Sequence, residues 1–234
     1  MRLLEEVIIE AEQTSHPFTL VYALTTAGCL VPLWTGDLQT AEQRISRLKE
    51  YAGSHALGNY SAAGLGFEGL LAAARGDLIT ATGLTTASVA ELHKRGFYVY
   101  HLVILTGLAE ILARSGEADD AMAAAEEAVE RADRGNNRWW MPEALRMTGE
   151  VIRLTAPENG AQAEDFFCRA VDLANRQGAL SWELRAATGL AQLLRDQARP
   201  ADAVALLQPV YEKFTEGFDT ADLVRAKALL DELQ

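Results

Sequence analysis

The turn Arg75-Gly76-Asp77, with Ala81 five residues after its glycine, recurs along this chain. The same kind of turn stands at Thr35-Gly36-Asp37 and at Ser115-Gly116-Glu117, so the period is about 40 residues. After a slip of two positions the same frame reaches two further turns, at 157–159 and 198–200. An alanine follows each turn at the same distance: Ala41, Ala81, Ala121, Ala163 and Ala203. Self-similarity at a fixed period of this size predicts a repeat architecture.

Amphipathic helical patterns flank each turn. Leu108, Ile111 and Leu112 precede the third turn, and Ala121 and Ala125 follow it, at the i, i+3, i+4 spacing of one helix face. We therefore predict a repeating unit of helix A, tight turn and helix B. The expected A helices are 17–35, 59–75, 98–115, 139–155 and 180–197, and the expected B helices are 37–53, 77–95, 117–134, 161–177 and 200–216. A leading helix at 3–14 and a closing helix at 219–233 flank the five hairpins.

Glycine, proline and cysteine add local expectations. Glycines that follow the turns by about 19 residues are expected to end the B helices in the left-handed conformation: Gly96, Gly135, Gly178 and Gly217. Pro32 and Pro209 fall inside helical patterns and are expected to kink or split them. Cys29 and Cys168 lie in apolar helical patterns, so we expect both to be small core residues.

The recurring turn, with its alanine five residues later, resembles the tetratricopeptide (TPR) repeat. In that family small residues let helices A and B approach, and the turn glycine takes a strained conformation. A small residue is also typical seven positions before the turn, where this chain has Cys29, Gly69, Ala109, Val151 and Ala191. The resemblance implies an all-α fold: a TPR-like right-handed superhelix of five helix-turn-helix hairpins with extra helices at both ends.

The C-terminal part resembles a narrower group. It reads QGALSWELRAA at 177–187, AQLLRDQ at 191–197 and FTEGFDTADL at 214–223. Over roughly 140–232 this is similar to the C-terminal end of large bacterial signalling proteins. Those proteins join an adenylate-cyclase or winged-helix DNA-binding domain to a P-loop ATPase and a TPR-like array. The resemblance implies that residues 1–234 are one TPR-like domain of a longer regulator, and the leading helix, which has B character and no A helix before it, fits this expectation.

Charge excludes some classes of partner. The chain of 234 residues has 21 Lys and Arg against 33 Asp and Glu, a net charge of −12. Such a chain has no concentration of basic residues that would bind a nucleic-acid backbone, and it is repelled by anionic membrane surfaces. The N-terminus lacks a basic signal-peptide region, and no apolar run is expected to reach the roughly 18 residues that span a bilayer. We expect a cytoplasmic protein without nucleic-acid or membrane contact.

The sequence shows no catalytic or cofactor motif. A GxGxxG pattern at 64–69 lies inside an expected A helix with no strand before it, so close helix packing explains it better than a dinucleotide. No GxxxxGK[ST] phosphate loop occurs. The four histidines, His16, His55, His93 and His101, have no metal-binding spacing. We expect no cofactor, no metal, no catalytic residue and no enzyme activity.

Two rows of residues repeat in register on the expected A helices. An aromatic row consists of Tyr60, Tyr100, Trp140 and Trp182, and a hydroxyl row includes Thr106, Thr148 and Thr188. Together with Arg185 they are the candidate binding groove, because the A helices of TPR-like arrays line the inner wall. The alternative is a packing ladder between repeats, with threonines that allow close approach, and we favour this alternative for both rows. Full burial of Tyr100 and Trp140 would remove them from the groove.

These observations favour a non-catalytic module of a signal-transduction or transcriptional regulator. Its partner would be a protein, a peptide or another domain of the parent regulator. The alternative is a small-molecule sensor that holds a metabolite effector within the superhelix. The sequence leaves open a homo-oligomer.

Overall fold

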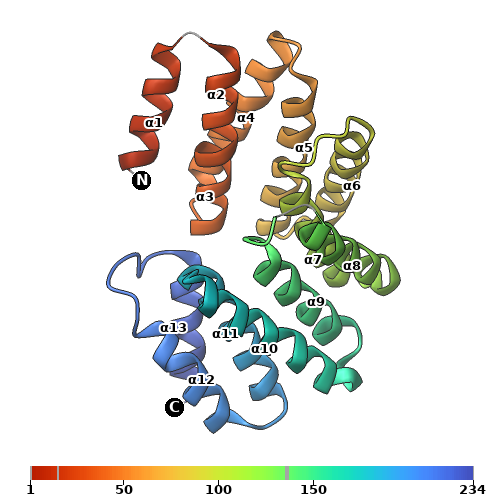
Figure 1. Ribbon diagram of the computed structural model, residues 1–234, viewed down its shortest axis with the longest axis vertical. Helices are drawn as coiled ribbons and strands as arrows, with labels where there is room; N and C mark the ends of the chain where they lie inside the picture. Colours follow the sequence, from red (N-terminus) through yellow and green to blue (C-terminus); the bar gives the residue numbers. More distant parts are fainter. Residues whose placement is uncertain (1, 15, 135–136, 234) are drawn as a thin grey trace. The chain divides into compact units, whose positions relative to one another are not determined.

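The computed structural model describes residues 2–14, 16–134 and 137–233. Over these ranges the regular elements are helices, and none is a strand (Figure 1). The chain divides into two compact units, residues 1–111 and 112–234, and the boundary falls within one helix, α7. The all-α TPR-like fold expected from the sequence is therefore confirmed.

The first unit begins with a leading helix and two complete hairpins. Its elements are α1 (Arg2–Gln13), α2 (Pro17–Ala23), η1 (Leu24–Cys29), α3 (Leu30–Thr35), α4 (Leu38–Ser54), α5 (Gly58–Ala74), α6 (Leu78–Lys94) and most of α7 (His101–Ser115). The expected first A helix consists of α2, the π-helical segment η1 and α3, which follow one another without a break. α4 packs against η1, α3 and α5, and α5 packs against α6.

The second unit contains two further hairpins and the closing helix. Its elements are α8 (Ala118–Arg134), α9 (Met141–Thr155), η2 (Pro157–Asn159), α10 (Gly160–Gln177), α11 (Leu180–Asp196), α12 (Pro200–Tyr211) and α13 (Ala221–Leu233). Each helix packs against the next in the chain. The A helices also contact one another across repeats, α9 with α11 and α11 with α13. These three helices therefore form one continuous layer of the unit.

The recurring turn has the backbone conformation that the sequence predicts. Gly36, Gly76 and Gly116 all have positive φ, between 84° and 87°, which glycine adopts without strain. Asp37 and Asp77 then cap α4 and α6, each accepting a bond of 3.1 Å from the backbone N–H three residues later. The alanines five residues after the turns are fully buried: Ala41, Ala81, Ala121, Ala163 and Ala203. Their small size lets helices A and B pack closely.

The glycines of the GxGxxG pattern serve the same close packing. They lie inside α5, with no strand before them. A Cβ on Gly66 would lie 2.5 Å from Cδ1 of Ile104, and a Cβ on Gly69 would lie 2.7 Å from Cγ2 of Thr85. The packing interpretation is therefore confirmed.

Several boundaries differ from the expectation. α7 begins at His101 instead of residue 98. Residues 97–100 precede it outside a helix, and the rings of Phe97 and Tyr100 pack on Tyr60, with centroids 5.6 and 6.4 Å away. α12 ends at Tyr211 instead of residue 216. The following segment folds back, and the ring of Phe218 lies 5.9 Å from that of Tyr211.

The expected proline and glycine effects have mixed outcomes. Pro209 lies within α12 without splitting it, whereas the π-helical segment η1 ends three residues before Pro32. A π-helical turn is a usual accommodation next to a residue that lacks an N–H. Gly178 ends α10 and Gly96 follows the end of α6, both with positive φ. Gly217 also has positive φ but lies in the loop before α13, and Gly135 lies outside the described residues.

The two cysteines have different environments. Cys29 is fully buried, as expected, and burial raises its pKa to about 12. The expectation is wrong for Cys168, which is exposed on α10. Its position between the buried Phe167 and Ala170 puts it on the outer side of the helix.

The expectation that no segment is long and apolar enough for a bilayer is corrected by Pro17–Thr35. This helical run has 19 residues and a mean hydropathy of 1.4. Half of it is buried, with Leu20, Val21 and Leu24 in the core of the first unit, and its middle packs against α4 and α5. Its composition is that of a core helix as much as of a membrane span.

Candidate binding site

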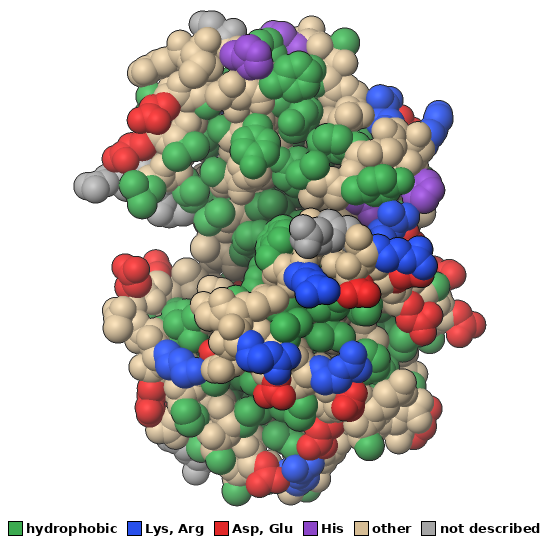
Figure 2. Space-filling model, in the orientation of Figure 1, with side chains coloured by type: hydrophobic (Ala, Val, Ile, Leu, Met, Phe, Trp, Pro, Cys, Tyr) green, Lys and Arg blue, Asp and Glu red, His purple; other side chains and the backbone are tan. Residues whose placement is uncertain are grey.

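A polar cleft lies on the layer formed by α9, α11 and α13. Its lining is Arg146, Glu150, Arg185, Thr188, Gly189, Gln192, Asp222 and Arg225. Figure 2 shows basic side chains interspersed with acidic ones on this part of the second unit. The three helices are successive A-type helices, so one face of a helical repeat positions the whole set. Two of the residues expected in a groove, Arg185 and Thr188, line this cleft.

The buried carboxylate of Glu143 joins two of the helices that form the cleft. Glu143 of α9 accepts two bonds from Arg146, at 2.8 and 2.9 Å, and one from Arg185 of α11, at 2.7 Å. Only 5% of its side chain is exposed. Burial alone would raise the pKa of Glu143, but the charges and hydrogen bonds of the two arginines outweigh it and lower the pKa. Glu143 is therefore an ionised anchor between two repeats.

A second carboxylate lies on the same helix. Glu150 accepts two bonds from Arg153, at 2.8 and 2.9 Å, and Arg153 also donates to Asp196 of α11 at 3.3 Å. Burial would raise the pKa of Glu150, but the Arg153 bonds, with the charges of Arg146 and Arg225, lower it. The acidic side chains of the cleft are thus already occupied by arginines.

Three of the residues that line the cleft have hydrogen-bond donors without a partner among the described residues. Arg185 uses its Nη atoms for Glu143 and, at 3.4 Å, for Asp222, but its buried Nε–H has no partner among the described residues. Gln192 and Arg225 make no side-chain hydrogen bond or ion pair with any residue that the structure describes. Buried polar atoms are nearly always satisfied in folded proteins. The Nε–H of Arg185 is buried, so the donors that a partner can reach are those of Gln192 and the exposed Arg225.

The aromatic row lies differently in each unit. In the first unit Tyr100 is only 3% exposed, and its ring packs edge-on against the fully buried Phe67 at 5.9 Å. Burial, first, and the neighbouring Tyr60 raise the pKa of Tyr100 above its usual range. Tyr60 is half-buried, 6.3 Å from the exposed ring of Phe18. Tyr100 is therefore removed from the candidate groove, and its ring belongs to the core.

The same correction applies to Trp140 in the second unit. It is only 2% exposed, and it packs edge-on against Trp182 and Trp139, both at 5.0 Å. Trp182 is half-buried, and its ring lies 5.6 Å from the guanidinium carbon of Arg185. Trp139, which the row did not include, is 52% exposed. Trp182 is thus the aromatic side chain next to the cleft, through its contact with Arg185, and Trp139 is an exposed ring packed on Trp140.

The threonine row does not offer free hydroxyls. Thr106, Thr148 and Thr188 are buried, and each donates to the backbone carbonyl four residues earlier, at 2.9, 3.0 and 2.7 Å. Because those protons are used inside each helix, the row does not form a floor of free donors. The geometry is that of small residues at close helix contacts.

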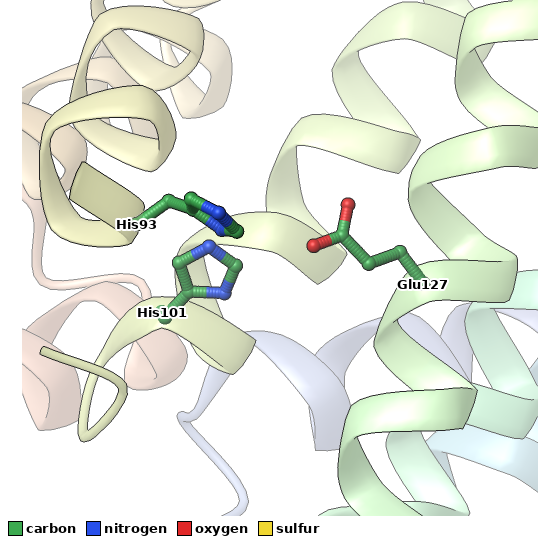
Figure 3. Close-up of side chains that lie close together, drawn as sticks. All are labelled: His93, His101 and Glu127. Atoms are coloured by element: carbon green, nitrogen blue, oxygen red, sulfur yellow. The ribbon is translucent and has the colours of Figure 1, made fainter. Parts of the chain in front are cut away.

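Two histidines of the first unit lie together although their sequence spacing gave no indication of it. The ring centroids of His93 and His101 are 6.3 Å apart, with His93 at the exposed end of α6 and His101 buried at the start of α7 (Figure 3). Zinc needs three or four protein ligands, and this pair supplies two. Glu127, also drawn in Figure 3, is a residue of the second unit, where it accepts from Nε of Arg131 at 2.6 Å.

A signal for the missed cleft residues was present in the sequence. Arg146, Arg185 and Arg225 recur at close to the repeat period on the A helices. Residues at the period of a helical repeat stack along one face. A comparison of aromatic and hydroxyl residues alone does not find this arginine row, of which only Arg185 was expected in the groove.

The comparisons with known proteins agree with the fold. No family model matches this sequence, and no curated protein matches it. Two crystal structures of nearly identical TPR-like repeats of a putative kinesin light chain from Podosopora anserina are similar in structure, each with a TM-score of 0.55. One is 14% identical and covers 94% of this chain and 98% of its own. The other, a variant with a single substitution, is 15% identical and covers 77% and 88%. The chain therefore has a TPR-like helical-repeat fold.

Proposed function

We propose that this chain is a non-catalytic module that holds a protein partner against the α9, α11 and α13 layer. The observation that carries the proposal is the cleft in that layer, where Gln192 and the exposed Arg225 lie beside an Arg185 that Glu143 holds in place. TPR-like folds are generally protein-interaction modules. The half-buried Trp182 lies next to Arg185 of the cleft, and Trp and Arg are the residues that most often dominate binding energy at interfaces.

The size of the cleft favours a partner surface over an enclosed metabolite. Its volume is about 30 Å³, whereas pockets that enclose small molecules measure roughly 300–1,000 Å³. A cleft of this size receives one functional group of a larger partner. The small-molecule sensor is therefore not the function that this site supports.

The charges of the cleft also favour binding over catalysis. General acids and bases work best when their pKa lies near the working pH. The pKa values of Glu143 and Glu150 are instead lowered by their arginine partners. Both carboxylates stay ionised at neutral pH and serve to position arginines.

We further propose that the module belongs to a cytoplasmic bacterial signal-transduction or transcriptional regulator. The support is the resemblance over residues 140–232, which contains every residue that lines the cleft. The partner would then be another protein or another domain of the same regulator. Sequencing the reading frame ahead of residue 1 tests this context. In-frame ATPase and output domains would support it, and an in-frame stop codon just upstream would contradict it.

Site-directed photo-crosslinking in the native host tests the binding site itself. A benzophenone amino acid replaces Gln192 in the cleft, and in a control protein it replaces Arg169, which is exposed on α10. We expect a discrete adduct, identified by mass spectrometry, from position 192 and none from position 169. Equal labelling at both positions, or no adduct at 192, would contradict the proposal.

A further inference from the structure

We propose that the exposed side of α1 receives a basic amphipathic helix of a partner protein, which packs there as an A helix. This surface belongs to the first unit and shares no residue with the cleft of the second. α1 has the place of a B helix in the repeat and lies at one end of its unit (Figure 1). The B helices α4, α10 and α12 each pack against the A helix before them and the A helix after them.

α1 packs against the A helix that follows it in the chain. Its contacts are with α2 and η1, and Cδ1 of the buried Ile8 would lie 3.4 Å from a Cβ on Gly28 of η1. Glu5 and Glu12 of α1 pair with arginines of α4, the neighbouring B helix. These contacts cover two sides of α1.

Two large apolar side chains lie on another side of α1. Leu3 is 70% exposed and Val7 is 46% exposed, and their spacing of four residues puts them one above the other. Since successive residues of an α-helix are about 100° apart, this pair lies opposite Glu5 and Glu12. Leu3 and Val7 therefore face away from α4, and they have the spacing with which one helix packs on another.

The closing helix of the chain has a different outer surface. The exposed charged residues of α13 are Arg225, Lys227, Asp231 and Glu232. The end helices of repeat arrays need such a polar outer face to stay soluble. α1, with Leu3 and Val7 outermost, has instead the surface of a B helix that an A helix covers.

The charges beside the apolar pair favour a basic occupant. Glu6 and Glu10 are exposed, and the same helical geometry puts them next to Leu3 and Val7. Glu10 has no hydrogen bond or ion pair with any residue that the structure describes. A partner helix that places Lys or Arg against these carboxylates is attracted, whereas an acidic helix is repelled.

The same charges disfavour a second copy of this chain as the occupant. A symmetric pair of α1 helices would bring Glu6 and Glu10 of both copies together, and like charges across an interface suppress such pairing. The net charge of −12 adds to this repulsion. Because α1 has 12 residues and is about 18 Å long, the partner helix needs about three turns to cover it.

Selection from a helical peptide library tests the inference. Peptides of about 18 residues, long enough to form a helix, have an alanine-rich framework and one randomised face. They are displayed on phage and selected on the full chain, after the peptides that bind Val7→Gln have been removed. We expect the recovered peptides to share apolar residues four positions apart with Lys or Arg beside them. Synthetic copies should bind the wild type about tenfold or more tightly than Val7→Gln.

Two matched variants control for charge and for apolar surface. Glu10→Gln should weaken peptide binding by about threefold. Glu12→Gln removes the same charge from the same helix but on the side that faces Arg47 of α4, so it should bind as the wild type does. Ile79→Gln makes the change of Val7→Gln at a residue of α6 that is 90% exposed, and it should also bind like the wild type.

Several outcomes would overturn the inference. They are recovered peptides without basic residues, equal affinities of Glu10→Gln and Glu12→Gln, and a library that yields no binder. Light scattering of the wild type and Val7→Gln supplies a further one. A wild-type dimer that Val7→Gln separates would show that a second copy covers α1. None of these outcomes depends on the crosslink from position 192, which tests the proposed function.

Discussion

Arg185 of α11 donates from Nη2 to Oε1 of Glu143 of α9 at 2.7 Å, joining two A helices one repeat apart. Arg146 binds the same carboxylate from within α9, so one buried acid orients two arginines of the cleft. Removing one member of such a buried network is costly, because the charges that remain lose their partner in a poorly solvated place.

Glu143→Gln should destabilise the protein by about 3–5 kcal/mol, because both guanidiniums lose their bonds to a buried carboxylate. The free energy of unfolding in urea measures this loss. Asp165→Asn is the control, since its pair with Arg169 is exposed and exposed pairs contribute about 0–1 kcal/mol. Equal effects of the two substitutions would show that the Glu143 network does not stabilise the fold.

The same network predicts how stability depends on pH. The folded pKa of Glu143 is lowered below its ordinary value of 4.5. Its contribution is therefore fully present above that value and is lost as the pH falls through the lower, folded pKa. Between pH 7 and pH 3 the wild type should lose more unfolding free energy than Glu143→Gln, which has no acid at this position. Parallel losses in the two proteins would contradict the lowered pKa.

Trp140 and its neighbour Trp139 differ in burial, so replacing each with alanine should change stability by different amounts. Trp140 is 2% exposed, so Trp140→Ala should cost about 3–5 kcal/mol of unfolding free energy. Trp139 is 52% exposed, so Trp139→Ala should change stability by about 0.5 kcal/mol or less. Denaturant titrations of the two variants measure both effects. A larger loss for Trp139→Ala would mean that the environments of the two rings are assigned the wrong way round.

Glycine substitutions test the close packing of the A helices. A Cβ on Gly189 would lie 2.6 Å from Cε1 of Phe167, which is fully buried and has no room to move. Gly189→Ala should therefore destabilise by about 1–3 kcal/mol. A Cβ on Gly83 of α6 would have no atom within 4 Å, so Gly83→Ala should stabilise by about 0.5–1 kcal/mol. Thermal unfolding distinguishes them, and a melting temperature raised by both changes would contradict the contact with Phe167.

The helical-repeat architecture could be predicted because each repeat depends on short-range conformational and size requirements of single residues. The turn at Gly76 needs positive φ, and Ala81 needs a small side chain, so both leave a signal that recurs with the repeat. The ends of α7 and α12 could not be predicted in this way. They depend on ring contacts such as Tyr211 with Phe218, which form only when the chain is folded.

The candidate site was predicted only in part, for a related reason. Periodicity places Arg185 and Tyr100 on A helices but does not say which way a side chain points or how much of it is covered. Tyr100 is in the core, whereas Arg185 lines the cleft. The carboxylate that fixes Arg185 belongs to Glu143 of the preceding repeat, and only the packing of α9 on α11 brings the two together.

The Nε–Hε signal of Arg185 in a ¹⁵N-labelled chain tests the central claim most directly. Arg185→Lys, which lacks this group, assigns the signal. When the protein captured at position 192 is added, we predict that this signal shifts and that its exchange with water slows. A signal that stays in place while backbone amides outside α9, α11 and α13 shift would contradict the claim that the cleft is the binding site.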